Sequence, residues 1–391
     1  MFRAAVRRNI PRRTFAGPLT STRYRATALS PSLSYLAARR SFSSTIPSYQ
    51  PSLTKKPVDE KATVGTEGPH KQDMPPASSG SALTKDDAVS TIPTMVKGDW
   101  VLFHPVYTPQ ELKSVEVMHR ETKMLSDKIA AGFVTVLRKG FDIISQYKYK
   151  PVPANSTMST EELRKAGYVM NETQWLHRIL FLESVAGVPG MVAATLRHLR
   201  SLRLMRRDAG WIHTLLEEAE NERMHLMTFM TLKKPSIIFR ALVLGAQGVF
   251  YNLFFFSYLI SPKTCHRFVG HLEEEAVLTY TRCIEEIEAG HFPEWANRPA
   301  PEIAKDYWRL KPDANMLDVV YAVRSDETTH RFVNHSLANL NQTTDVNPFA
   351  LREPTMDVKG HKIAFERDEA EKYVQESHRI LSEGSKAVTP Q

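Results

Sequence analysis

The sequence predicts an all-α protein built as a bundle of long helices. Three observations support this prediction. Long segments rich in good helix formers are separated by Pro and Gly. No segment shows the two-residue alternation of a β-strand. Four of the helical segments carry an apolar stripe interrupted by a single glutamate, and each of these glutamates is expected to point into the bundle.

Six long helices are expected between these breakers. Their predicted ranges are 110–145, 172–202, 207–232, 236–260, 263–289 and 314–341. The breaks between them coincide with prolines or glycines, among them Pro151, Pro235, Pro262 and Pro312. A further short helix over 366–382 is expected in a charged, peripheral C-terminal tail.

The N-terminal region differs in composition from the rest of the chain. Its first 50 residues contain nine arginines and no acidic residue, whereas the 391-residue chain carries a net charge of +8. An Arg-rich, Ser-rich and acid-poor N-terminus is typical of a mitochondrial transit peptide. A basic arm for nucleic acid is the alternative. The arginines alternate with Ala, Leu, Phe and Tyr, so we expect a transit peptide and no nucleic-acid partner.

The expected domain organisation follows from these changes in composition. It comprises a transit peptide at 1–42, a disordered Pro/Ser-rich linker at 43–98, a helical bundle domain at 99–345 and a charged C-terminal tail at 346–391. The chain has two cysteines, Cys265 and Cys283, which exclude a disulfide framework and a Cys-rich metal site. A metal site in this chain must therefore use carboxylate and imidazole ligands.

Glu-x-x-His on a helix places a carboxylate and an imidazole on the same face. The predicted bundle domain contains four such pairs: Glu116/His119, Glu222/His225, Glu288/His291 and Glu327/His330. The first pair lies beside the apolar stripe of its segment, and the third straddles Gly290, where a helix should end. The second and fourth pairs lie on apolar stripes, so we expect them to face inward.

Two further glutamates, Glu183 and Glu273, interrupt the apolar stripes of the other two helices. Glu183 lies 21 residues before a turn near residue 204 and Glu222 lies 18 residues after it. In an antiparallel hairpin the two are offset by roughly 4–5 Å. Buried carboxylates must be paired, protonated or bound to a metal. Oxygen and imidazole ligands in this number favour two iron or manganese ions, although periodicity alone does not choose among Glu273, Glu274 and Glu275.

Residues 241–260 contain no charged side chain and are long enough to span a bilayer. A span here would put Glu222 and Glu273 on opposite sides of the membrane, so we expect this helix to lie in the membrane interface. Its possible contacts with anionic lipid are Arg203, Arg206, Arg207, Lys233, Lys234 and Arg240. The alternative is a buried core helix of a soluble bundle.

Four sequence blocks resemble the motifs of the alternative oxidases. They are LESVAGVPGM at 182–191, EEAENERMHL at 217–226, LEEEA at 272–276 and RSDETTHRFVNH at 324–335. The resemblance covers about 120–341 and implies a ferritin-like di-iron four-helix bundle, with two additional helices forming a membrane-interface face. The fourth block departs from many members at Ser325, Thr328 and Thr329, but its ligand positions are unchanged.

The resemblance also implies roles for individual residues. It makes Glu183 and Glu273 terminal ligands and Glu222 and Glu327 bridging ligands of two Fe ions, completed by His225 and His330. It places Asn221, Asp326 and Trp308 in a hydrogen-bond network around the irons. It makes Tyr280 the tyrosine that donates an electron and a proton; without the resemblance, Tyr280 reads equally well as a buried tyrosine with a satisfied hydroxyl.

Two surface sets follow from the same resemblance. A quinol pocket is implied at Arg138, Asp142, Arg178, Leu182, Leu272, Ala276 and Thr279. A homodimer contact set is implied at His198, Leu202, Arg203, Arg223, Leu226 and Gln247. On spacing alone, Arg138 and Asp142 form only an i,i+4 ion pair.

The expected function is therefore a cyanide-resistant ubiquinol oxidase. It would oxidise two ubiquinols and reduce O₂ to water without proton pumping, as a monotopic protein on the matrix side of the mitochondrial inner membrane. Two alternatives use the same scaffold: a di-iron hydroxylase or desaturase, and a non-enzymatic ferritin-like iron binder. The first would differ in its product, and the second would be soluble and form cages.

Overall fold

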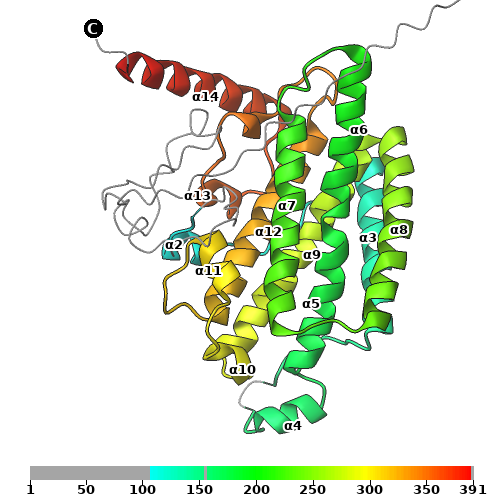
Figure 1. The fold of residues 1–391 in the computed structure, drawn as a ribbon, viewed down its shortest axis with the longest axis vertical. Coiled ribbons are helices and arrows are strands. Elements are labelled where there is room, and N and C mark those ends of the chain that lie inside the picture. Colours follow the sequence, from blue (N-terminus) through cyan, green and yellow to red (C-terminus); the bar gives the residue numbers. More distant parts are fainter. Residues whose placement is uncertain (1–105, 154–155, 389–391) are drawn as a thin grey trace, which may run out of the picture. The chain divides into compact units, whose positions relative to one another are not determined.

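The computed structural model describes residues 106–153 and 156–388, and all regular structure in this part is helical (Figure 1). The long helices are α3 (Leu125–Ile144), α5 (Glu172–Ala186), α6 (Val188–Leu204), α7 (Trp211–Leu232), α8 (Ile237–Ile260), α9 (Pro262–Glu288), α12 (Met316–Asn339) and α14 (Arg367–Val388). The short ones are α2 (Pro109–Lys113), α4 (Thr160–Lys165), α10 (Pro293–Ala296), α11 (Glu302–Trp308), η1 (Pro348–Ala350) and α13 (Met356–Lys359). The predicted all-α helical bundle is confirmed. The expected transit peptide and linker lie outside the described residues.

Two helix pairs form the centre of the bundle. Helix α12 packs along α9, and α5 and α6 pack along α7 (Figure 1). Helix α3 lies against α9, and α8 lies against α6 and α9. The four helices predicted to carry an inward-facing glutamate are α5, α7, α9 and α12. Their packing brings one such glutamate from each helix toward a common interior.

Side-chain caps explain where several of these helices begin. The Asn315 side chain accepts hydrogen bonds from two backbone N–H groups at the start of α12, and Asp318 closes the capping box. Ser236 caps α8, and Ser261 caps α9 just before Pro262. Proline is favourable there because the first N–H of a helix has no intrahelical partner.

One predicted helix is wrong over a third of its length. The range 110–145 was expected to be continuous, but α2 ends at Lys113 and α3 begins at Leu125. The intervening segment crosses α12, where Arg331 donates a hydrogen bond to the backbone carbonyl of Glu116 at 3.0 Å. Long-range hydrogen bonds therefore replace the intrahelical ones, and local helix propensity is overridden.

The predicted helix 172–202 is divided at Gly187 into α5 and α6. Pro189 is the second residue of α6 and lacks the N–H that would continue the helical ladder. Just beyond this break, α6 packs closely against α7. A Cβ at Gly190 would lie 2.6 Å from the carbonyl oxygen of Leu215, so only glycine permits the observed approach of α6 to α7.

The hydrophobic core consists of two clusters with the glutamates between them. Along α9, Val269 belongs to one cluster and Tyr280 to the other, and Glu273 lies between these two residues.

The C-terminal tail was expected to be peripheral, and this expectation is wrong for part of it. Phe365 and Ala370 are buried in the same cluster as Val269 because the tail folds back over the end of α12.

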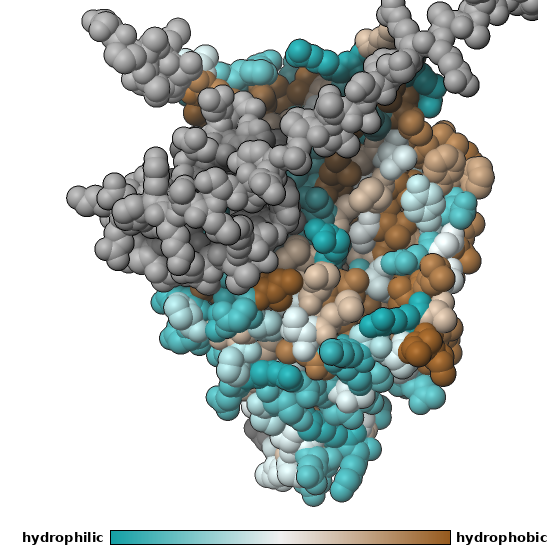
Figure 2. Space-filling model, in the orientation of Figure 1, coloured by the Kyte–Doolittle hydropathy of each residue, from teal (hydrophilic) through white to brown (hydrophobic). Residues whose placement is uncertain are grey.

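Two helical stretches in the described part are long and apolar enough to span a membrane: Glu172–Leu204 and Ile237–Ile260. In the first, 56% of the apolar window is buried, but in α8 only 6% is buried. The alternative that α8 is a core helix is therefore wrong. Figure 2 shows apolar residues on the side of the molecule where α3 and α8 lie in Figure 1. Exposed apolar residues of these two helices include Ile129, Phe133, Val136, Leu242, Leu244, Val249, Leu253, Phe256 and Leu259.

Candidate metal centre

The structure brings all six predicted ligands together in the interior of the bundle. Glu183 comes from α5, Glu222 and His225 from α7, Glu273 from α9, and Glu327 and His330 from α12. Their ligand atoms form two overlapping groups, each with all atoms within 4.8 Å of one another. Glu222 and Glu327 belong to both groups, so two neighbouring metal positions would share these two carboxylates. All six side chains are buried.

The unsatisfied atoms of these side chains test whether a metal fits. Both carboxylate oxygens of Glu222, one oxygen of Glu183 and the Nδ1 atoms of His225 and His330 are buried. None of these atoms has a hydrogen bond of good geometry among the described residues, although His330 Nδ1 forms an ion pair with Glu222 Oε1 at 2.8 Å. Buried polar atoms are almost always hydrogen-bonded in folded proteins. Five such atoms facing one another therefore fit a site built for cations.

The orientation of His225 supports the same conclusion. Its Nδ1 lies 3.4 Å from Glu183, 3.5 Å from Glu222 and 3.4 Å from Glu327. Its Nε2 lies 2.9 Å from Oδ2 of Asp326, outside the group of carboxylates. A proton on Nε2 donates to that carboxylate and leaves the Nδ1 lone pair for a metal. Metal-binding histidines typically have such a carboxylate partner.

The pKa values show that the carboxylates crowd one another. Burial, helped by the neighbouring Glu222 and Glu327 carboxylates, raises the pKa of Glu183 to about 8. Burial and the same two neighbours hold the pKa of Glu273 well above its usual range. A cation stabilises the ionised forms and displaces these protons, so metal uptake should release protons.

Asp326 is the centre of a hydrogen-bond network behind the ligands. Besides His225, its Oδ2 accepts hydrogen bonds from Asn221 Nδ2 and Trp308 Nε1, each at 2.9 Å. The three residues that the family resemblance assigned to this network are thus in contact. Sequence reasoning missed Tyr107, whose hydroxyl donates to Oδ1 of Asp326 at 2.6 Å. Tyr107 lies outside any helical pattern, so the sequence offers no signal for it.

Tyr307 was also missed, although it precedes Trp308. Its hydroxyl accepts a hydrogen bond from Asn221 Nδ2 at 2.9 Å. Tyr280 lies on the other side of the centre, where its hydroxyl donates to Glu183. Burial and the Glu183 carboxylate hold the pKa of Tyr280 well above its usual range, so its hydroxyl keeps its proton.

The polar members of the predicted quinol pocket form one network across three helices. Asp142 accepts from Arg138 at 3.1 Å and from Arg178 at 2.7 Å. Arg138 also contacts Thr279 Oγ1 at 3.4 Å. Glu275, which had not been predicted, pairs with Arg138 at 2.7 Å. The predicted apolar members Leu182, Leu272 and Ala276 are each partly exposed.

The predicted dimer set lies largely on the surface. His198, Leu202, Arg203 and Arg223 are exposed, and Leu226 is partly exposed. Gln247 is partly exposed, and its side chain is already engaged within the chain: it donates a hydrogen bond to the carbonyl oxygen of Ser184 at 2.6 Å.

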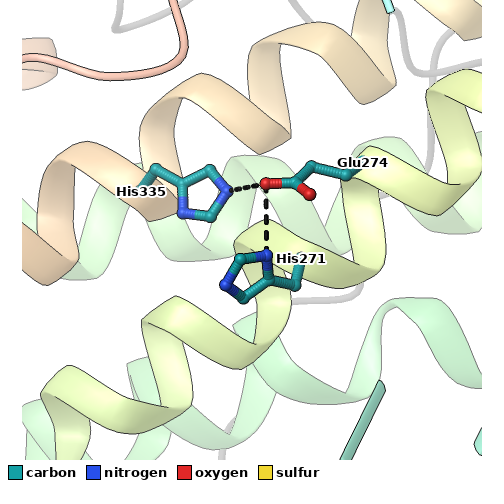
Figure 3. A group of neighbouring side chains, drawn as sticks. All are labelled: His271, Glu274 and His335. Atoms are coloured by element: carbon teal, nitrogen blue, oxygen red, sulfur yellow. Dashed lines mark hydrogen bonds and ion pairs between the residues drawn. The ribbon is translucent and has the colours of Figure 1, made fainter. Parts of the chain in front are cut away.

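A second buried cluster of histidine and glutamate lies on α9 and α12. We call it the Glu274 cluster; it consists of His271, Glu274 and His335 (Figure 3). Both imidazoles point toward the same carboxylate oxygen: His335 Nε2 lies 2.7 Å and His271 Nδ1 lies 3.2 Å from Glu274 Oε1. By residue type alone, this cluster resembles a third metal position.

Arg267 argues against a metal in the Glu274 cluster. Its Nη1 lies 2.9 Å from Nδ1 of His335. A guanidinium only donates, so Nδ1 must accept and the proton of the neutral ring must be on Nε2. Burial lowers the pKa of His335 to about 4, which keeps the ring neutral. The Nε2–H then donates to Glu274, and no lone pair is left there for a metal.

The three consecutive glutamates of α9 thus have different partners. Glu273 faces the metal ligands, Glu274 binds the buried histidines, and Glu275 pairs with Arg138. This arrangement agrees with the resemblance-based choice of Glu273.

Fold and site together define a helical bundle with a buried carboxylate–histidine centre suited to binding metal. A family model described as "Alternative oxidase" matches residues 107–339. "Alternative oxidase, mitochondrial" of Cryptococcus neoformans var. grubii is 52% identical over 347 residues, which cover 86% of this chain and 84% of that relative. The proteins of the same name from Emericella nidulans and Aspergillus niger are 57% and 54% identical over 258 residues, which cover 66% of this chain and 70% and 71% of those relatives. The chain belongs to the alternative oxidase family and is an oxidoreductase of the oxidase type.

Proposed function

We propose that this chain is a ubiquinol oxidase that oxidises two ubiquinols and reduces one O₂ to two waters. The observation that carries the proposal is the set of buried, unsatisfied ligand atoms at the positions that resemble the iron ligands of the family. Two irons, when bound, would supply the redox chemistry toward O₂. Glu183 and His225 would be ligands of one metal, and Glu273 and His330 would be ligands of the other. Glu222 and Glu327 would be ligands of both metals.

The protein's own groups would orient the ligands and handle protons. Asp326 holds His225 through Nε2, which fixes the imidazole that faces the centre. Tyr280 keeps its proton and donates a hydrogen bond to Glu183, so its hydroxyl is held beside a ligand, where an electron and a proton can leave together. Burial of all six ligands excludes bulk water from the reacting atoms.

The network around Arg138 is the proposed quinol site. A quinol must lose two protons for every two electrons, so its hydroxyls need acceptors. The carboxylates of Asp142 and Glu275 are partly exposed at this position and can accept them. Arg138 orients both carboxylates, and Arg178 also pairs with Asp142. The aliphatic side chains of Leu182 and Leu272 would contact the apolar ring.

We further infer that the chain is attached to one leaflet of the mitochondrial inner membrane, on its matrix side. The relatives are named mitochondrial, the N-terminal composition is typical of a transit peptide, and α8 exposes an apolar surface. Exposed basic residues, including Arg203, Arg206 and Arg240, can contact anionic lipid. The exposed members of the dimer set leave room for a second copy of the chain. Attachment to one leaflet provides no path for protons across the bilayer, so we expect no proton pumping.

Oxygen uptake by membranes containing the protein tests the oxidase activity. A short-chain ubiquinol is supplied with cyanide present throughout. We expect uptake with two quinols consumed per O₂, and loss of at least about a thousandfold in Glu222→Ala, because the metals supply several kcal/mol of transition-state stabilisation. Glu220→Ala is the matched control, since Glu220 is exposed on the same helix.

Two outcomes would contradict the proposal. Equal uptake by Glu222→Ala and wild type would separate the activity from the metal centre. Absence of uptake in a wild-type protein that holds two irons would favour a hydroxylase, a desaturase or an iron-storage role. A search for an oxygenated or desaturated product would then decide among these.

Vesicle flotation tests the membrane attachment. Replacing Leu244 and Phe256 with glutamate puts two charges on the exposed apolar face of α8, where they are 72% and 60% exposed. We expect this variant to dissociate from vesicles. The control Val346→Glu/Leu381→Glu adds the same charge at exposed apolar positions elsewhere and should still float. Retention of the α8 variant would contradict attachment through this face.

A further inference from the structure

The chain between residues 106 and 120, which we call the arm, lies across α12 and reaches α9. Two arginines of α12 hold its backbone. Arg324 donates to the carbonyl oxygen of Leu112 at 2.5 Å, and Arg331 donates to that of Glu116 at 3.0 Å. Seven residues separate the two arginines, so they lie on one face of α12, two turns apart. The ligands Glu327 and His330 are between them in the sequence.

Both ends of the arm contact a residue next to a proposed metal ligand. At one end, the Tyr107 hydroxyl donates to Asp326, which directly precedes Glu327. At the other end, the backbone N–H of Arg120 donates to Glu274 at 2.9 Å, and Glu274 directly follows Glu273. The arm therefore joins α12 and α9 at the level of the metal centre.

The contact of Tyr107 is the more direct of the two. Asp326 uses Oδ2 to accept from His225 Nε2, Asn221 and Trp308, and Oδ1 to accept from Tyr107. A carboxylate held at both oxygens cannot rotate about its Cβ–Cγ bond. The hydroxyl of Tyr107 thus fixes the plane of the carboxylate that fixes the ring of His225.

The Tyr107 ring is itself well anchored. It packs against the first core cluster and against the small cluster of Val115, Val277 and Met356. Burial and the Asp326 carboxylate hold the pKa of Tyr107 well above its usual range, so the hydroxyl remains a donor at physiological pH. Its geometry is set by packing and does not depend on the metal.

We propose that Tyr107 is a positioning residue of the metal centre, acting through Asp326 on the orientation of His225. This inference rests on the proposed metal centre and adds a residue outside the four ligand-bearing helices. It makes the arm a functional part of the centre, since the arm is the element that places Tyr107. Partners of metal-binding histidines typically change metal affinity or activity by about 10–100-fold.

Tyr107→Phe tests the proposal because it removes the hydroxyl and keeps the ring. The purified full-length protein is loaded with ferrous iron, and the rate of iron release to a chelator is measured. We expect release about tenfold faster than in wild type, at the lower end of the range for such partners because Tyr107 acts through Asp326. We also expect a changed electron paramagnetic resonance spectrum of the half-reduced centre, which reports the ligand field directly.

Tyr373→Phe is the matched control. The Tyr373 hydroxyl also donates one hydrogen bond, to the carbonyl oxygen of Arg352 at 3.1 Å, but it belongs to α14. This variant should release iron at the wild-type rate and show the wild-type spectrum. If Tyr107→Phe behaves like Tyr373→Phe in both measurements, the proposal is overturned, even where both variants melt at a lower temperature.

The wild-type protein separates this failure from failure of the proposed function. Two irons bound per wild-type chain, with an unchanged Tyr107→Phe variant, would reject the positioning role alone. A wild-type chain that binds no iron would reject the metal centre and this inference with it.

Discussion

Two buried clusters of histidine and glutamate both include residues of α9 and α12, yet their chemistry is opposite. In the metal centre, the imidazole Nδ1 atoms face carboxylates, and five ligand atoms have no hydrogen-bond partner among the described residues. In the Glu274 cluster, donors surround the carboxylate: both imidazoles and the backbone of Arg120. One member of each cluster, Glu273 and Glu274, is adjacent to the other in the sequence.

The difference lies in the surrounding charges. Among the described residues, Glu183, Glu222 and Glu327 form ion pairs with histidines but with no arginine or lysine. Arg267, by contrast, contacts the Glu274 cluster directly and determines which nitrogen of His335 carries the proton. Residue type and burial alone therefore do not identify a metal site; the position of the proton on each imidazole is also needed.

Replacement of one glutamate in each cluster should give the largest contrast. Glu327→Gln removes a carboxylate shared by both metal positions, so we expect oxidase activity to fall by at least about a thousandfold, together with the bound metal. Glu274→Gln should keep two metals and activity within about twofold. It should instead lower the free energy of unfolding by about 3 kcal/mol, because buried donors lose an anionic partner.

Metal analysis, oxygen uptake and denaturant unfolding of both variants check this contrast. Loss of metal from Glu274→Gln, or a third metal in wild type that His271→Gln removes, would show that the Glu274 cluster also binds metal.

The two clusters should also respond to pH in opposite directions in the metal-free protein. The pKa of Glu183 is raised to about 8 in the folded state from an ordinary value of 4.5, so the folded state binds the proton more tightly. Its contribution to stability is complete below pH 4.5 and is lost as the pH rises through 8, an effect of about 5 kcal/mol. The pKa of His335 is lowered from 6.5 to about 4, so its contribution is lost as the pH falls from 6.5 to 4.

Melting temperatures of metal-free wild type, Glu183→Gln and the metal-loaded protein between pH 4 and 8 measure these effects. We expect Glu183→Gln, and separately bound metal, to reduce the loss on the alkaline side while leaving the loss on the acid side, because Glu218 and Glu286, whose pKa values are raised to about 7, also contribute to the alkaline loss. A Glu183→Gln profile identical to that of the metal-free wild type would show that Glu183 is ionised throughout.

Gly270→Ala should produce the smallest effect, and only in the Glu274 cluster. A Cβ at this position would lie 2.6 Å from Nδ1 of His335, so the imidazole, which also accepts a hydrogen bond from Arg267, would have to shift. We expect a net loss of about 1–2 kcal/mol in unfolding free energy, since the strain exceeds the gain in helix propensity. Metal content should remain at the wild-type level, and a fall would show that the two clusters are coupled.

Much of the fold and of the candidate site could be predicted because both depend on helical periodicity. An α-helix places residues three and four apart on one face, so Glu222 with His225 and Glu327 with His330 were expected to face inward from spacing alone. The single glutamates on the apolar stripes of the two other helices follow from the same rule. The choice of Glu273 over Glu274 and Glu275 needed the apolar stripe together with the family resemblance.

Other features depend on contacts between distant parts of the chain. The break after Lys113 exists because arginines of α12 bind the backbone of the arm, and nothing within residues 110–145 encodes that partner. The roles of Tyr107 and Tyr307 and the burial of Phe365 have the same origin.

The sequence by itself thus determined the helices, their inward faces and the residues able to bind metal, because these properties repeat at the period of the helix. The tertiary structure alone decided which carboxylates face a cation and which face an arginine. Glu273 and Glu274 are adjacent and chemically identical, but they point about 100° apart around α9. What each side chain meets there is set by other helices and by the arm, through hydrogen bonds that span more than 50 residues of chain.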